Sequence, residues 1–401
     1  ISLGANTLTL TGGGSLVSGG LTLNDPSSML LLNSITVDNV STTSYSLGLD
    51  IDADSTVTSL LVANITPVSI ANTKSLSGAI TVTAGSLKLN ETGTLASTIV
   101  MSGGTLDADE TSTVSGALTQ SGDITIDVAT GKTLTYYSGT NVGIGANTLT
   151  VIGGGTLSNQ NAIVLDNTNS KLILNSVTLK VVTTSEASEG IDVDNDSTIT
   201  SFSVANITPV AIASGKTLSG GITVSAGSIK LNETGTLAST IAMSGGTLDA
   251  DDSLVVSGAL TQSGDITIDV ADNKTLTYSG AAVEIGEYTL NVIGGGILNN
   301  NNALVLSSGG SKLLLDSTTL NKASTSSGSL GLDVDAASTV TSLLVANITP
   351  VSIASGSILS GGITVSAGSL KLNETGMLAS SVSMSRGTIL DIEKSMTISG
   401  S

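Results

Sequence analysis

A short apolar repeat constrains the fold of this chain more than any other feature. Between residues 76 and 134 the apolar side chains return to the same places about every 19 residues, as at Leu76, Leu95 and Val114. Within each repeat they alternate with polar residues, for example in the run Ile80-Thr81-Val82-Thr83. This alternation is typical of a strand with one buried face. Because one such unit cannot bury its apolar side alone, the pattern predicts units that stack on one another.

Small turn-forming residues separate the predicted strands, as in Ala84-Gly85-Ser86 and Ser102-Gly103-Gly104. The predicted fold is therefore all-β, a single-stranded parallel β-helix (β-solenoid) of right-handed coils. We expect about 20 coils of about 19 to 23 residues, which at ~4.8 Å per coil gives a rod on the order of 95 Å long.

A long repeat lies above the short one. The segment 62–68 returns at 204–210 and again at 345–351, at spacings of 142 and 141 residues. The chain is accordingly divided into long repeats 1–141, 142–282 and 283–401, the last incomplete, and we expect it to be part of a longer array. The coil from Leu134 to Leu157 is longer than its neighbours, and the polar, irregular stretch 177–190 predicts a long loop.

Composition excludes several classes of protein. The chain has 47 glycines, 1% aromatic residues, no cysteine and no histidine, which removes disulfides, thiolate or imidazole metal sites and the usual nucleophiles and bases. Its mean hydropathy of +0.39 and its periodic Leu, Ile and Val residues argue against disorder.

The charge balance limits the possible partners. With a formal net charge of -19 and Arg386 as the only arginine, neither nucleic acid nor an anionic membrane surface is an expected partner. No apolar run is long enough to cross a bilayer. Because the chain starts at Ile1 without a methionine or export signal, we expect any signal or anchor to lie outside it.

The most suggestive cluster is an acidic triplet, Asp50, Asp52 and Asp54, with equivalents in the later long repeats. Alternation predicts all three carboxylates on one strand face, where Ca²⁺ binding is conceivable. The spacing lacks the glycine and glutamate of an EF-hand loop, and the third aspartate becomes Ala337 in the last repeat. A solvated acidic face is the preferred interpretation, so no metal, cofactor-binding or catalytic residue is predicted. Calcium binding by the triplet and its repeats stays open.

Four further motifs receive structural interpretations. The triplets of glycine that start at Gly12, Gly153 and Gly294 precede strands, which indicates tight corners and not phosphate-binding loops. The Asn-x-Thr triplets at Asn90, Asn232 and Asn373 match glycosylation acceptors, but an Asn bonding its own backbone at a corner is preferred. Gln120 and Gln262 occupy inward positions and need a corner backbone group or a trapped water. Thr-x-Thr pairs are interpreted as scattered solvent-face residues; they lie at Thr81 and Thr83, Thr133 and Thr135, and Thr148 and Thr150.

Runs such as 75–89 and 101–107 resemble the repeats in β-helical passengers of autotransporters and in filamentous-haemagglutinin-like bacterial surface adhesins. The resemblance covers essentially the whole chain and is compositional. It implies export by a Gram-negative-type bacterium, a parallel β-helix and a role at the cell surface.

The sequence thus favours a secreted or cell-surface structural protein, a stiff repetitive fibre or adhesin stalk without catalysis in this region. We expect self-association with like chains in a fibre or surface layer, with a host or cell-surface glycan as a further possible partner. The alternative is a glycan-binding or glycan-cleaving β-helix, although sugar-stacking aromatics and basic partners are scarce. An ice-binding solenoid is a third and less favoured interpretation of the function.

Overall fold

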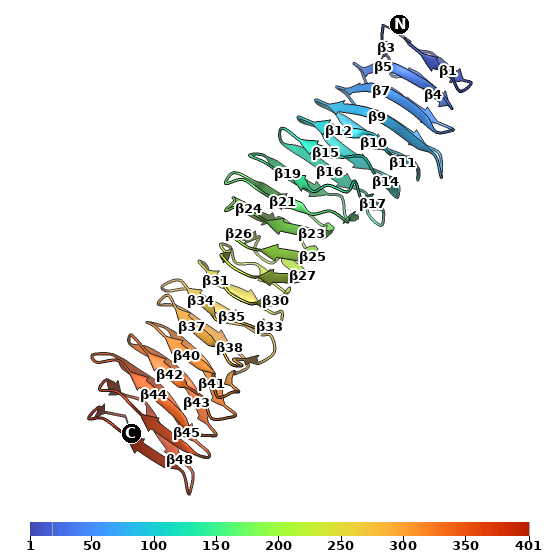
Figure 1. Cartoon of the computed structure of the whole chain (residues 1–401). Coiled ribbons are helices and arrows are strands. Elements are labelled where there is room, and N and C mark those ends of the chain that lie inside the picture. Colours follow the sequence, from blue (N-terminus) through green and yellow to red (C-terminus); the bar gives the residue numbers. More distant parts are fainter. Residues whose placement is uncertain (18, 401) are drawn as a thin grey trace. The chain divides into compact units, whose positions relative to one another are not determined.

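The computed structural model describes residues 1–17 and 19–400, and these form strands and turns without any helix. The chain divides into two compact units, Ile1–Ser201 (unit 1) and Phe202–Ser401 (unit 2). Parallel strands stack in about 20 coils, which makes the fold a β-solenoid, as the short repeat predicts. Figure 1 shows successive strands within each unit following one another in the order of the sequence.

Each coil contributes one short strand to one sheet, and one long strand or two shorter strands in its place to a second sheet. We call these the short-strand sheet and the long-strand sheet.

In unit 1 the short-strand sheet contains β1 (Thr7–Thr11), β4 (Met29–Asn33), β6 (Gly48–Ile51), β8 (Thr66–Ile70), β10 (Ser86–Leu89), β13 (Thr105–Ala108), β16 (Ile124–Val128), β19 (Thr148–Ile152), β22 (Lys171–Leu174) and β24 (Gly190–Val193). Its long-strand sheet contains β2 (Ser15–Leu16), β3 (Leu21–Leu23), β5 (Thr36–Thr42), β7 (Ser55–Val62), β9 (Ser75–Val82), β11 (Thr94–Leu95), β12 (Thr98–Met101), β14 (Ser112–Val114), β15 (Leu118–Gln120), β17 (Thr133–Tyr136), β18 (Val142–Gly143), β20 (Thr156–Asn159), β21 (Ile163–Leu165) and β23 (Thr178–Thr184).

In unit 2 the short-strand sheet contains β26 (Ile207–Ile212), β28 (Ser228–Leu231), β31 (Thr247–Ala250), β34 (Ile266–Val270), β37 (Thr289–Ile293), β40 (Lys312–Leu315), β42 (Gly331–Val334), β44 (Thr349–Ile353), β46 (Ser369–Leu372) and β49 (Ile389–Ile392). Its long-strand sheet contains β27 (Thr217–Val224), β29 (Thr236–Leu237), β30 (Thr240–Met243), β32 (Leu254–Val256), β33 (Leu260–Gln262), β35 (Thr275–Tyr278), β36 (Val283–Glu284), β38 (Ile297–Asn300), β39 (Leu304–Leu306), β41 (Thr319–Thr325), β43 (Ser338–Val345), β45 (Ile358–Val365), β47 (Met377–Leu378), β48 (Ser381–Met384) and β50 (Thr397–Ile398). The strand β25 (Ser197–Val204) includes the division between the units.

Stacked aliphatic columns form the interior. In the long-strand sheet Leu76 pairs with Leu95, and Leu95 pairs with Val114, all of them fully buried. In the short-strand sheet Leu87 pairs with Leu106 in the same way. Burial of each leucine side chain contributes roughly 1.5–3 kcal/mol before entropy is counted, so these columns hold the coils together. The predicted period of about 19 residues is confirmed here.

A glycine allows the pairing between two long strands to shift its register. In β7 the inward positions Val57 and Leu60 are three residues apart, and the pairing with β9 shifts its register between them. Opposite the shift lies Gly78, whose φ is 119° and whose Cβ, if present, would lie 1.8 Å from the carbonyl oxygen of Val57. Only glycine fits this close backbone approach without strain.

The prediction of a long loop over residues 177–190 is wrong. Thr178–Thr184 is the strand β23, and only residues 185–189 connect it to β24. The alternation is hidden because Leu179 and Val182 both face inward although they are three residues apart. By contrast, the longer coil predicted between Leu134 and Leu157 is confirmed, since these two residues pair directly.

Candidate functional site

The acidic triplet of the first long repeat runs from the end of a strand through a corner and does not share one strand face, which corrects the prediction. β6 ends at Ile51, so Asp50 lies on the strand and Asp52 lies in the bend that follows. Asp54 lies at the end of this corner, where its Oδ1 accepts hydrogen bonds from the backbone N–H and the hydroxyl of Ser75 at 2.8 and 3.0 Å. Across residues 1–17 and 19–400, no group of three acidic side chains is placed to hold a metal ion.

In the later repeats the aspartates equivalent to Asp50 form ion pairs. Lys171 Nζ lies 3.1 Å from Asp192 Oδ2, and Lys312 Nζ lies 2.7 Å from Asp333 Oδ2. In the first repeat the position of these lysines is taken by Met29, which occupies the same place in the strand pairing. The carboxylates at this position therefore serve contacts between coils.

Asp50 itself shows the effect of the missing lysine. Burial, followed by the negative charge of Asp52, raises the pKa of Asp50 above its ordinary value. A Ca²⁺ site needs several converging oxygen ligands, and here Asp54 is already bonded to the next coil.

A second set of ion pairs lies on the outward face of the short-strand sheet. Lys88 Nζ lies 2.9 Å from Asp107 Oδ2 and 2.7 Å from Asp109 Oδ2. The pKa of Lys88 is raised because its bonds to Asp109 and Asp107 outweigh burial, the largest opposing influence. The second long repeat has the same arrangement around Lys230, with Asp249 and Asp251. Each of these partly exposed pairs stabilises the fold by at most about 1 kcal/mol.

A further carboxylate follows in the same row. Asp127 pairs in register with Asp107, and Asp269 pairs with Asp249 in the second repeat. Burial raises the pKa of Asp127, and the charges of Asp107 and Asp109 raise it further; burial and Asp251 act in the same way on Asp269. Paired carboxyls of this kind occur at acid–base sites, but these four belong to an open sheet face.

The glycine triplets form tight corners, as predicted. Gly153 and Gly154 have φ values of 110° and 81° and connect β19 to β20. A Cβ at Gly153 would lie 2.1 Å from Asp127 Oδ1, so the preceding coil requires glycine here. Gly294 is equivalent, with Asp269 Oδ1 at 2.1 Å. Because a strand follows each corner, neither has the helix N-terminus of a phosphate site.

The preferred interpretation of the Asn-x-Thr triplets is wrong at two of them. Asn90 follows β10 as expected, but Oδ1 of Asn90 and of Asn373 is buried and has no hydrogen-bond partner within the described residues. Asn232 is exposed. The local backbone bond is found instead at Asn64, whose Oδ1 accepts from the N–H of Ile65 at 2.9 Å. The equivalent bonds recur at Asn206 and Asn347.

The Thr-x-Thr pairs behave differently from one another. Thr133 and Thr135 pair in register with Thr156 and Ser158, so they are not scattered as predicted. Thr148 and Thr150 pair with Lys171 and Ile173, and the hydroxyl row ends there. Outward hydroxyls therefore form a patch around Thr133 and Thr156 on the long-strand sheet and a row that runs through Thr125 and Thr150 on the short-strand sheet.

Gln120 makes the corner contact that its inward position requires. Its side chain is 8% exposed, and Nε2 donates a hydrogen bond to the backbone oxygen of Thr148 at 2.8 Å. Asp123 Oδ1 accepts from the N–H of the same Thr148 at 2.7 Å. The two side chains thus bind the backbone carbonyl and the backbone N–H of one residue in the next coil. Gln262 and Asp265 do the same to Thr289.

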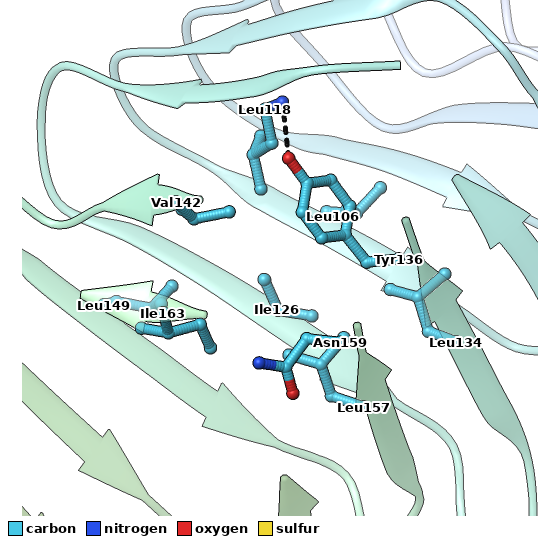
Figure 2. A pocket seen from close by; sticks show the side chains of 10 residues that line it. All are labelled: Leu106, Leu118, Ile126, Leu134, Tyr136, Val142, Leu149, Leu157, Asn159 and Ile163. Carbon is cyan, nitrogen blue, oxygen red and sulfur yellow. Dashed lines mark hydrogen bonds between the residues drawn. The ribbon is translucent and has the colours of Figure 1, made fainter. Parts of the chain in front are cut away.

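Tyr136 lies beside these contacts, and Figure 2 shows its hydroxyl bonded to Leu118. Its ring is buried, and its hydroxyl accepts a hydrogen bond from the N–H of Leu118 at 3.1 Å. In the second repeat Tyr278 accepts from Leu260 at 3.0 Å. Burial, opposed by the bond from Leu260, raises the pKa of Tyr278. We call these two sets junction 1 (Leu118–Asp123, Tyr136 and Thr148) and junction 2 (Leu260–Asp265, Tyr278 and Thr289).

No role for the buried asparagines beside the junctions was predicted from the sequence. Asn159 is 1% exposed; its Oδ1 accepts from the N–H of Lys180 and its Nδ2 donates to the carbonyl of Val181. These bonds serve the backbone that bulges between Leu179 and Val182. Asn300 repeats the arrangement. The one available signal is that an Asn takes an inward column position in both repeats.

Two hollows lie beside junction 1, one of them small and the other open. The cavity in Figure 2, lined by Asn159 and by apolar side chains such as Leu118 and Val142, has a volume of about 10 Å³, which is less than one small molecule needs. An open hollow of about 340 Å³ lies over Gly104, Thr125 and Thr150, and Asp123 is its only titratable lining residue. A carboxylate pair for glycoside cleavage is absent from this lining.

No helix in the described part of the chain is long and apolar enough to cross a membrane. Comparisons with protein-family models, with curated proteins and with solved structures found no match.

Proposed function

We propose that this chain is a structural segment of a bacterial surface fibre or adhesin stalk, exported to the cell exterior and without catalysis. One observation supports this most: many of the polar and charged side chains bond along the stack, from coil to coil, and the ion pairs lie on the open sheet face. Lys88 with Asp107, Asp54 with Ser75, and Gln120 with Thr148 all link neighbouring coils.

The energetics of stacked coils fit a spacer. Each coil contacts mainly its two neighbours, so stability grows with each added coil and length can change by duplication. The near-identical long repeats of the sequence agree with growth of this kind. We further propose that the chains associate laterally with like chains; sedimentation of the purified chain at rising concentration tests this.

A glycan array and a polysaccharide turnover assay with the purified chain test the proposal. We expect neither specific retention nor product release, and we expect long protease resistance with cleavage confined to exposed loops such as residues 185–189. Specific retention or turnover that is lost in a double variant, Asp107→Asn with Asp127→Asn, would establish the glycan-active alternative. Antibodies against the chain should label intact source cells; labelling only after permeabilisation would contradict the surface location.

The short hydroxyl patch around Thr133 and Thr156 favours one secondary candidate, an ice-binding face. Ice recrystallisation in the presence of the chain, with Thr156→Val as the matched variant, decides it. We expect no inhibition, because Lys171 and Ile173 interrupt the other Thr-x-Thr row.

A further inference from the structure

The backbone ladder of the long-strand sheet is interrupted at junction 1. One coil earlier, the N–H of Ile99 donates to the backbone oxygen of Ala117 at 2.7 Å. At the equivalent position the N–H of Leu118 donates to the Tyr136 hydroxyl at 3.1 Å. One coil later, Val142 again donates to a backbone oxygen, at 2.9 Å. A side chain therefore replaces one rung of the ladder.

Junction 2 repeats the interruption independently. Ile241 donates to a backbone oxygen at 2.8 Å, Leu260 donates to the Tyr278 hydroxyl at 3.0 Å, and Val283 returns to a backbone oxygen at 3.2 Å. The strand pairing agrees with these bonds. β15 pairs with β12 and β18 pairs with β21, whereas β15 and β18 lie in contact without a described pairing. β33 and β36 show the same relation.

Coil length explains the interruption. The coils before each junction have about 19 residues, while the coil that follows carries extra residues between β17 and β18, which shift its backbone away from β15. The hydroxyl of Tyr136 then accepts the bond from the Leu118 N–H that has lost its ladder partner, while Gln120 and Asp123 bind the backbone of Thr148 at the start of the next short strand. One side-chain acceptor at each junction is left unsatisfied, because Oε1 of Gln120 and of Gln262 is buried without a partner within the described residues.

We propose that junctions 1 and 2 are the places where the solenoid opens first, so that local unfolding starts at intervals of one long repeat. A ladder bond breaks only when two strands separate, but the bond to Tyr136 is lost when one side chain rotates. In the proposed stalk these sites would yield first under load; that consequence rests on the proposed function, whereas the opening does not.

Hydrogen–deuterium exchange of the full chain, resolved to single residues by fragmentation, tests the proposal. The amides of Leu118 and Leu260 should exchange about tenfold faster than those of Ile99 and Ile241, which hold the same place one coil earlier. Equal or slower exchange at Leu118 and Leu260 would overturn the proposal.

The variant Tyr136→Phe removes only the hydroxyl. It should accelerate exchange at Leu118 a further three- to tenfold and leave Leu260 unchanged, and Tyr278→Phe should give the reverse. Two results would also contradict local opening: exchange that is accelerated equally at every amide, and exchange that is accelerated at neither Leu118 nor Leu260. The comparison within the unmodified chain stays decisive if a variant fails to fold.

Discussion

At the scale of single residues, whether a position requires glycine depends on the neighbouring coil as well as on the turn that contains the position. Gly12 and Gly153 have almost the same φ, 111° and 110°. A Cβ at Gly12 would have no atom within 4 Å, while one at Gly153 would meet Asp127 Oδ1 at 2.1 Å and Val128 O at 2.3 Å. The pair therefore separates the cost of backbone strain from the cost of contact with the neighbouring coil.

Gly153→Ala should lower the free energy of unfolding by about 2–4 kcal/mol, because strain and overpacking both act. Gly12→Ala, the matched control, should lower it by only about 1–2 kcal/mol, since strain alone acts there. Urea unfolding of the two variants measures the difference. Equal losses would mean that the contact with Asp127 relaxes without cost.

At the scale of the element, charged side chains line up in rows across successive strands of the short-strand sheet. The sequence shows lysines and aspartates spread over the chain, yet the parallel register places Lys88, Asp107 and Asp127 side by side on successive strands. Each row includes one cation for several carboxylates. The raised pKa of Asp127 is the result, since burial and its acidic neighbours together disfavour its charged form.

This raised pKa predicts a pH dependence with a definite sign. The folded chain holds a proton on Asp127 and on Asp269 at pH values where the unfolded chain has released it. These groups therefore stabilise the fold most fully below the ordinary pKa of 3.8, and that contribution is lost as pH rises through the folded pKa. Asp127→Asn should flatten the fall in unfolding free energy above about pH 4 and raise stability at pH 7 by less than about 1 kcal/mol.

Urea unfolding from pH 3 to pH 7 measures this slope. Asp269→Asn should have the same effect, and the two changes should add, because they lie in different long repeats. If the unfolding free energy of the Asp127→Asn chain had the same pH profile as that of the unmodified chain, the charges of the row Lys88, Asp107 and Asp127 would be fully screened by solvent.

At the scale of the whole molecule, the phase of the repeat matters more than its exact length. Deletion of residues 91–232 joins Asn90 to Glu233, which restores the sequence of the same corner. Because coils interact with their neighbours, the shortened chain should keep its β circular dichroism and melt within a few degrees of the full chain.

A deletion of residues 91–222 is the matched control, since it removes ten residues fewer and joins the chain about half a coil out of phase. The control should melt at a clearly lower temperature or aggregate. Similar melting of both deletion variants would show that the coils do not depend on a fixed register.

The sequence by itself determined the short period, the inward columns and the strands that alternate regularly, because each depends on alternation and spacing that can be counted along the chain; the strand β23, with its irregular spacing, was missed. It also located the glycine corners and the inward position of Gln120. Only the tertiary structure decided which groups meet between coils: Asp54 bonds Ser75, Tyr136 receives the N–H of Leu118, and Asn159 holds the bulge in β23. The physical reason is that coil length varies along the chain, so the partners lie 18 to 25 residues apart in ways that a fixed period does not specify.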